Sequence, residues 1–72
     1  MYQTFILDRL KFAKSLNNAR EMANISQSGA AETLGITQTA ISRFESAQKV
    51  PSLEIAKRMA VLYGVKLDEL LE

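Results

Sequence analysis

The chain has 72 residues, nine basic against eight acidic side chains, and neither cysteine nor histidine. A chain of this length forms one small domain, near the lower size limit for a core without disulfides or a metal. The missing cysteine and histidine exclude a disulfide framework and remove the commonest metal ligand and general base, so we expect no metal, no cofactor and no enzyme activity. No apolar run is long enough to span a membrane and no signal-peptide pattern opens the chain, which predicts a soluble cytoplasmic protein.

The first predicted helix begins at Thr4 or Asp8, either of which can cap it, and runs to about Ala23. An apolar stripe follows helical spacing along it, at Phe5, Phe12, Leu16, Ala19 and Ala23, with Leu10 and Ala13 beside it. The polar side of the same helix carries Lys11, Lys14 and Arg20.

Residues 1–11 form an N-terminal extension that is rich in apolar side chains. One interpretation is that these residues simply lengthen the first helix. The other is an arm that packs on a second subunit, because Tyr2, Phe5 and Ile6 are costly to leave in water.

Residues 26–45 predict two short helices joined by a tight turn at Leu34-Gly35-Ile36. Ser26 can cap the first helix by accepting a free backbone N–H. Gly35 allows an abrupt end, since glycine enters the left-handed region without a Cβ clash. Thr37 caps the second helix, whose buried face is Ile41 and Phe44.

The outward side of the second short helix carries Gln38, Thr39, Ser42 and Arg43. Such side chains suit base edges in a major groove, because Gln pairs bidentately with adenine, Arg pairs with guanine and Thr offers a methyl group to thymine. The alternative is an ordinary solvated helix face. The tight turn between two capped helices favours base readout.

A fourth helix is expected from the cap Ser52 to Gly64, with a fifth over residues 67–71. The core side of the fourth helix is predicted to hold Leu53, Ala56, Met59, Ala60 and Tyr63. The apolar residues that this core leaves over are Ile55, Leu62 and Leu71. Residues 52–72 therefore present either a dimer face or a slightly enlarged core.

Charge is distributed unevenly along the chain. Asp68, Glu69 and Glu72 lie at the carboxyl end, so residues 1–67 carry nine basic against five acidic side chains. Phosphate attraction acts over a Debye length of about 10 Å, so segregated charge favours a nucleic-acid partner more than the net charge of +1 does.

Together these segments resemble the helix-turn-helix family of phage repressors, Cro and their bacterial relatives, also called the XRE type. The resemblance runs from Phe12 to Leu71 without a gap and rests on Ser26-Gln27, Ala31-Glu32, Leu34-Gly35-Ile36-Thr37-Gln38, Ile41-Ser42-Arg43-Phe44-Glu45, Pro51-Ser52-Leu53-Glu54, Gly64-Val65 and Leu67-Asp68-Glu69-Leu70-Leu71. It implies an all-α, compact five-helix, lambda-repressor-like DNA-binding domain over residues 1–72, in which helices two and three form the helix-turn-helix.

The resemblance also implies roles for single residues. Arg20 would pair with Glu45 and clamp the first helix to the third, a structural role. Gln27 would contact a phosphate and brace Gln38, and Thr37, Gln48 and Lys49 would hold further phosphates.

Three positions depart from the family's pattern. Asn24 and Ala47 stand where relatives often carry a glycine that ends a helix, and we expect about 1 kcal/mol of strain at Ala47 or a different loop path. Gly29 stands where relatives often carry a glutamate. Either the second helix starts later than Ser26 suggests, or the missing side chain allows a close backbone or phosphate approach.

The function that these patterns favour is a sequence-specific transcriptional regulator. We expect a homodimeric repressor that binds double-stranded DNA at a near-palindromic operator and associates with the nucleoid when bound. The alternative is a protein-interaction module or antitoxin-like partner protein that keeps the fold with little or no DNA binding. A phage repressor, a restriction–modification controller, an antitoxin and a small chromosomal regulator all fit the sequence equally well.

Overall fold

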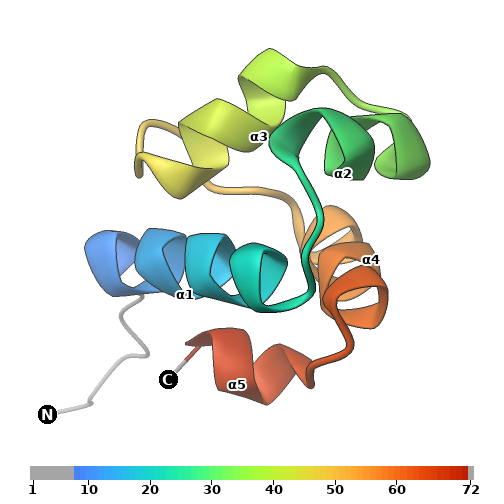
Figure 1. The fold of residues 1–72 in the computed structure, drawn as a ribbon. Coiled ribbons are helices and arrows are strands. Elements are labelled where there is room, and N and C mark those ends of the chain that lie inside the picture. Colours follow the sequence, from blue (N-terminus) through green and yellow to red (C-terminus); the bar gives the residue numbers. More distant parts are fainter. Residues whose placement is uncertain (1–7, 72) are drawn as a thin grey trace, which may run out of the picture.

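The computed structural model describes residues 8–71, and their secondary structure consists of five helices without a strand. The helices are α1 (Arg9–Met22), α2 (Gln27–Leu34), α3 (Gln38–Glu45), α4 (Leu53–Tyr63) and α5 (Leu67–Leu71). In Figure 1, α1 lies across the middle of the molecule, with α2 and α3 on one side of it and α5 on the other. The predicted all-α, five-helix architecture is confirmed. Predictions about Phe5 and the other residues of 1–7 lie outside the described residues.

Each of the first four helices begins at a side-chain cap. Asp8 accepts a hydrogen bond from the backbone N–H of Lys11 at 3.1 Å, and Asp8 is therefore the cap of α1. The three remaining caps are Ser26, Thr37 and Ser52, which accept from backbone N–H groups at 2.9, 3.0 and 3.2 Å. Each cap satisfies an N–H that the helix itself leaves free, which fixes where the helix starts.

The segments that follow α1 to α4 turn through one left-handed residue each. These residues are Asn24, Gly35, Ala47 and Gly64, with φ of 59°, 73°, 65° and 74°. The next residue then donates its N–H back to the helix, for example Gln48 to the carbonyl of Arg43 at 3.0 Å. Asn24 and Ala47 thus adopt the conformation for which relatives use glycine, and the loop after α3 takes the family's path with an alanine at the strained position.

The core lies between α1 and the other helices, with α1 packing against α3, α4 and α5. Its fully buried members include Leu16, Ala30, Ile41 and Met59, one from each of the first four helices, and α5 contributes Leu70. Because α3 buries Ile41 and Phe44 in this core, its opposite side is left facing solvent.

Two predictions about apolar residues were wrong. Leu53 is 66% exposed and Leu10 is 74% exposed, so neither belongs to the core. Leu53 is the first residue of α4. Helical spacing predicts both residues for the core side, but spacing along one helix does not determine which of its turns a neighbouring helix covers.

Gly29 does not delay the start of α2, because the helix begins at Gln27 and Gly29 donates its N–H to the Ser26 hydroxyl. A Cβ at this position would lie 3.2 Å from Ser26 Oγ and 3.6 Å from Ile25 Cγ2. A side chain at position 29 would therefore contact the cap closely, and of the two alternatives a later start of α2 is excluded.

Candidate functional site

The outer face of α3 presents four polar side chains to solvent. Gln38, Thr39, Ser42 and Arg43 are all exposed, whereas Ile41 on the opposite side of the helix is 0% exposed. We refer to these four side chains as the α3 outer face. Together they offer amide, hydroxyl and guanidinium groups on one short, capped helix, a combination that can donate to and accept from the edges of bases.

Residues on either side of α3 extend this polar surface. Thr37, Gln48 and Lys49 are exposed. The Thr37 hydroxyl accepts from Ala40 N at 3.0 Å, which leaves its own proton free to be donated. The backbone N–H groups of Gln48 and Lys49 both bond to Arg43 O, at 3.0 and 3.3 Å, so a phosphate at these two residues must be held by their side chains.

Beneath α3, the carboxylate of Glu45 collects donors from two other helices. Arg20 donates from Nε to Oε2 at 2.7 Å and from Nη2 to Oε1 at 3.1 Å. Asn17 Nδ2 and Gln27 Nε2 also donate to Oε1, at 2.8 and 3.0 Å. The Glu45 cluster (Asn17, Arg20, Gln27 and Glu45) therefore joins α1, α2 and the last residue of α3.

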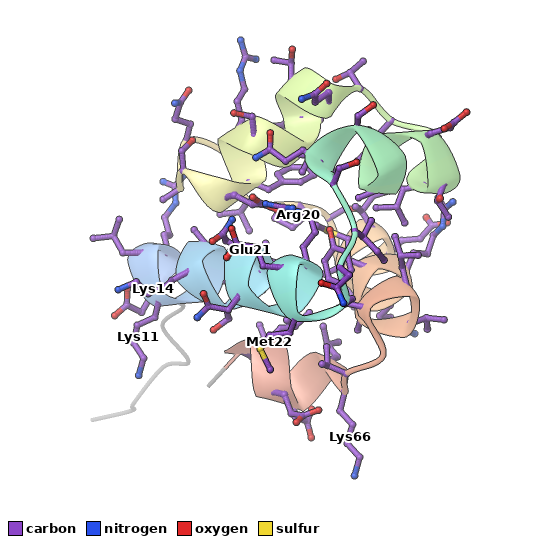
Figure 2. All side chains as sticks on the ribbon, in the orientation of Figure 1. Lys11, Lys14, Arg20, Glu21, Met22 and Lys66 are labelled. Atoms are coloured by element: carbon purple, nitrogen blue, oxygen red, sulfur yellow. The ribbon has the colours of Figure 1, made fainter. Side chains whose placement is uncertain are left out.

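Arg20 extends the cluster to the turn before α2, because its Nη1 donates to the Ile25 carbonyl at 2.7 Å. Figure 2 shows this side chain reaching from α1 into the space between α1 and α3. The Arg20 and Glu45 side chains are 10% and 5% exposed, so their charges meet largely away from water. A buried carboxylate of this kind is tolerated because its oxygens accept four hydrogen bonds, two of them from the oppositely charged Arg20.

The surroundings shift the pKa values of this cluster. Burial alone raises the pKa of Glu45, but hydrogen bonds from Arg20, Asn17 and Gln27 together with the charge of Arg20 outweigh it, and the pKa is lowered below 4.5. The hydrogen bond to Glu45 raises the pKa of Arg20 in turn. Burial, followed by the charge of Glu45, raises the pKa of Tyr63 to about 12. The hydroxyl of Tyr63 has no hydrogen-bond partner within the described residues.

Gln27 is placed differently from the family-based expectation. Its side-chain amide donates to Glu45, whereas the expected partner was Gln38. The amide nitrogen carries a second N–H, so a contact with an anion at the start of α2 is compatible with this bond.

Asn17 is a member of the cluster that sequence reasoning missed. It lies three residues before Arg20 and therefore on the same face of α1, a spacing that could have identified it.

The residues proposed for a dimer face are only partly accessible. Ile55 and Leu62 are partly buried against the core, and Leu71 is 39% exposed. The large apolar residues most exposed on α4 are instead Leu53 and Val61, and on α1 Leu10 and Met22.

Within residues 8–71, no group of three metal-ligating side chains is close enough to hold an ion. None of the described helices has the length and hydrophobicity needed to cross a membrane.

The chain matches the family model described as Helix-turn-helix over residues 16–70. It is 36% identical over 62 residues to the HTH-type transcriptional activator BcrR of Enterococcus faecalis, an alignment that spans 86% of this chain and 30% of the activator. The chain thus spans less than a third of that relative's length.

Several solved structures share the fold, of which two are described. The restriction-modification controller protein C.AhdI from Aeromonas hydrophila has a TM-score of 0.81 and 25% identity, over 88% of this chain and 96% of the controller. Hydroxypropylphosphonic acid epoxidase from S. wedmorenis also has a TM-score of 0.81, with 23% identity over 89% of this chain but 34% of the epoxidase. This second likeness concerns the fold alone.

Proposed function

The chain belongs to the helix-turn-helix family of the phage-repressor and Cro type, and from this membership we propose its function. The function is sequence-specific binding of double-stranded DNA in the control of transcription. The similarities to a transcriptional activator and to a restriction-modification controller protein support this reading. The family is one of transcription regulators, and the likeness to part of an epoxidase concerns the fold alone, so we propose no enzyme activity.

The observation that carries the proposal is that α3 exposes a polar face while the helix itself is held in place at both ends. The α3 outer face is accessible along the whole length of α3, while Ile41 and Phe44 hold the other side in the core. The cap Thr37 fixes one end of α3 and the Glu45 cluster fixes the other. A recognition helix needs both properties, since base readout requires donors at set distances from the groove.

In the proposed complex, side chains divide into two groups. Gln38, Thr39 and Arg43 read base edges in the major groove, with Ser42 in support. Gln27, Thr37, Gln48 and Lys49 contact phosphates, which fix the register of the protein on the duplex without reading sequence.

We further propose that the protein acts as a homodimer on an operator with approximate twofold symmetry. Half-sites would lie about 34–36 Å apart, one turn of the double helix. Leu71, with the accessible edges of Ile55 and Leu62, would contribute to the dimer face, and Phe5 could add to it. Repression then follows from occupancy of the operator, because a bound dimer obstructs polymerase.

Selection of binding sites from random duplexes tests the proposal directly. We expect a recovered consensus with two related half-sites whose centres are separated by 10–10.5 base pairs, as twofold symmetry and the pitch of B-DNA require. Failure to retain any duplex at low salt, where phosphate attraction is strongest, would rule out DNA binding and favour a protein-interaction module. A reporter assay with the recovered site would then separate repression from activation.

A further inference from the structure

The Glu45 cluster contains a contact that the Arg20–Glu45 clamp does not require. Asn17 Nδ2 donates to Glu45 Oε1 at 2.8 Å, across 28 positions of the chain, and this bond is shorter than the 3.1 Å contact from Arg20 to the same oxygen. Asn17 is partly buried on α1, and its neighbour Asn18 is exposed. Two adjacent residues of the same type therefore differ in whether they touch α3.

We propose that Asn17 is a positioning residue for DNA recognition, acting through Glu45 to set how α3 is presented to the duplex. The inference rests on the proposed function, and it adds a residue outside the α3 outer face. Asn17 contacts no base in this proposal, because its side chain is occupied beneath α3.

The geometry explains why one more donor matters. Arg20 approaches the carboxylate along one direction, through Nε and Nη2. Asn17 and Gln27 reach Oε1 from α1 and from α2, so the carboxylate is held against two helices at once. Removing the Asn17 donor takes away one of the two α1 side chains that bond to Glu45 and so loosens the end of α3 relative to α1. A base-reading surface tolerates displacements of only about 0.5 Å before its hydrogen bonds weaken.

Charged groups around Asn17 determine what a substitution does there. Arg20 and Glu45 lie in the cluster itself, and Tyr63 of α4 is close enough for both charges to act on its pKa. Lys11 and Lys14 line a surface groove of about 470 Å³ together with Asn17 and Glu45. A carboxylate introduced at position 17 would accept rather than donate, and would face Glu45 directly.

The test compares Asn17→Asp with the matched control Asn18→Asp, which adds the same charge one residue away on an exposed position. Affinity is measured for the selected duplex and for a scrambled duplex, by fluorescence anisotropy at pH 7.5. We expect Asn17→Asp to lower the ratio of selected to scrambled affinity by about tenfold or more, since base contacts are lost while phosphate contacts remain. Asn18→Asp should weaken both duplexes equally and leave the ratio unchanged.

A pH series separates positioning from general damage. In Asn17→Asp, two carboxylates share one site, and lowering the pH from 7.5 to 5 lets one of them take up a proton and donate to the other. The selected-to-scrambled ratio should then recover by about threefold or more, with no such recovery in Asn18→Asp. Should Asn17→Asp be unfolded by circular dichroism, Asn17→Ala carries the same ratio test, with an expected loss of about threefold or more.

The outcomes are distinguishable. If the wild-type chain retains the selected duplex and both variants at position 17 keep its affinity ratio, the role of Asn17 is overturned and the proposed function stands. If the wild-type chain retains no duplex, the proposed function fails, and the positioning role fails with it.

Discussion

Nε of Arg20 lies 2.7 Å from Oε2 of Glu45, which joins two residues 25 positions apart, one on the first helix and one at the end of the third. Both side chains are at least nine-tenths buried. Breaking such a pair by removing one partner leaves an uncompensated charge, which costs more than the intact pair contributes. The contact therefore connects the stability of the domain to the placement of the helix proposed to read DNA.

Glu45→Gln is expected to destabilise the domain by about 3 kcal/mol at pH 7, because the Arg20 charge loses its partner. The wild-type stability should also depend on pH. Since folding lowers the pKa of Glu45 from 4.5, its contribution is present above pH 4.5 and is lost as the pH falls through the folded value. Urea unfolding from pH 7 to pH 3 should show the gap between wild type and variant narrowing below pH 4.5.

Glu32→Gln is the matched control, because Glu32 is exposed on α2. It should change the free energy of unfolding by less than about 0.5 kcal/mol. A gap between wild type and Glu45→Gln that stays constant down to pH 3 would contradict the role assigned to the carboxylate.

Ala47→Gly is expected to stabilise the domain, an unusual direction for a glycine substitution. Ala47 holds φ at 65°, a conformation that costs about 1–2 kcal/mol for a residue with a Cβ. Glycine removes this strain but adds entropy to the unfolded chain, so the net gain should be about 0.5–1 kcal/mol in urea unfolding. Ala23→Gly is the control, since Ala23 has φ of −83° and glycine there should cost about 0.5–1 kcal/mol.

Tyr63→Phe is expected to leave stability unchanged or raise it by about 1 kcal/mol at pH 7, because it removes a buried hydroxyl that has no hydrogen-bond partner among residues 8–71. The pKa of Tyr63 is raised to about 12 from 10.0, so its neutral form favours folding up to pH 10, and that contribution disappears as the pH rises towards 12. The midpoint temperature of thermal unfolding should therefore fall less steeply between pH 9 and pH 12 in Tyr63→Phe than in the wild type. A loss of more than 1 kcal/mol at pH 7 would mean that the hydroxyl is hydrogen-bonded.

Gln38→Ala should lower affinity for the selected duplex by about 1–3 kcal/mol and relax the preference at one base pair, since its amide is proposed to read a base. Gln38 is exposed, so its replacement by alanine should leave the fold unchanged. Binding to a set of duplexes substituted at each position of the site would measure this. An equal loss across all of these duplexes would remove Gln38 from base readout.

Lys49→Ala should weaken binding to every duplex alike and reduce the slope of log affinity against log salt by about one, because a single phosphate contact is lost. Lys66→Ala is its control, since Lys66 lies at the far end of the molecule from α3 in Figure 2. The slope is measured for the wild type and both variants in the same salt titration. Equal slopes in wild type and Lys49→Ala would place Lys49 away from the backbone of DNA.

Short-range signals in the sequence were sufficient for most helix ends, although the start of α1 stayed open between Thr4 and Asp8. Ser26, Thr37 and Ser52 were predicted as caps and act as caps, because a hydroxyl reaches the N–H three residues ahead whatever surrounds the helix. Gly35 and Gly64 likewise end α2 and α4, since a left-handed residue depends on its own backbone. The exposure of Gln38 and Arg43 followed from the same helical spacing that buries Ile41 and Phe44.

Local sequence patterns are therefore enough to predict most helix ends and the side of α3 that faces water. Only the tertiary structure decided that Leu10 and Leu53 lie outside the core, and that Asn17 and Gln27 both donate to Glu45. The physical reason is distance along the chain. Caps and turns are made by residues within six positions of each other, whereas the Glu45 contacts span 18 to 28 positions and depend on how three helices pack.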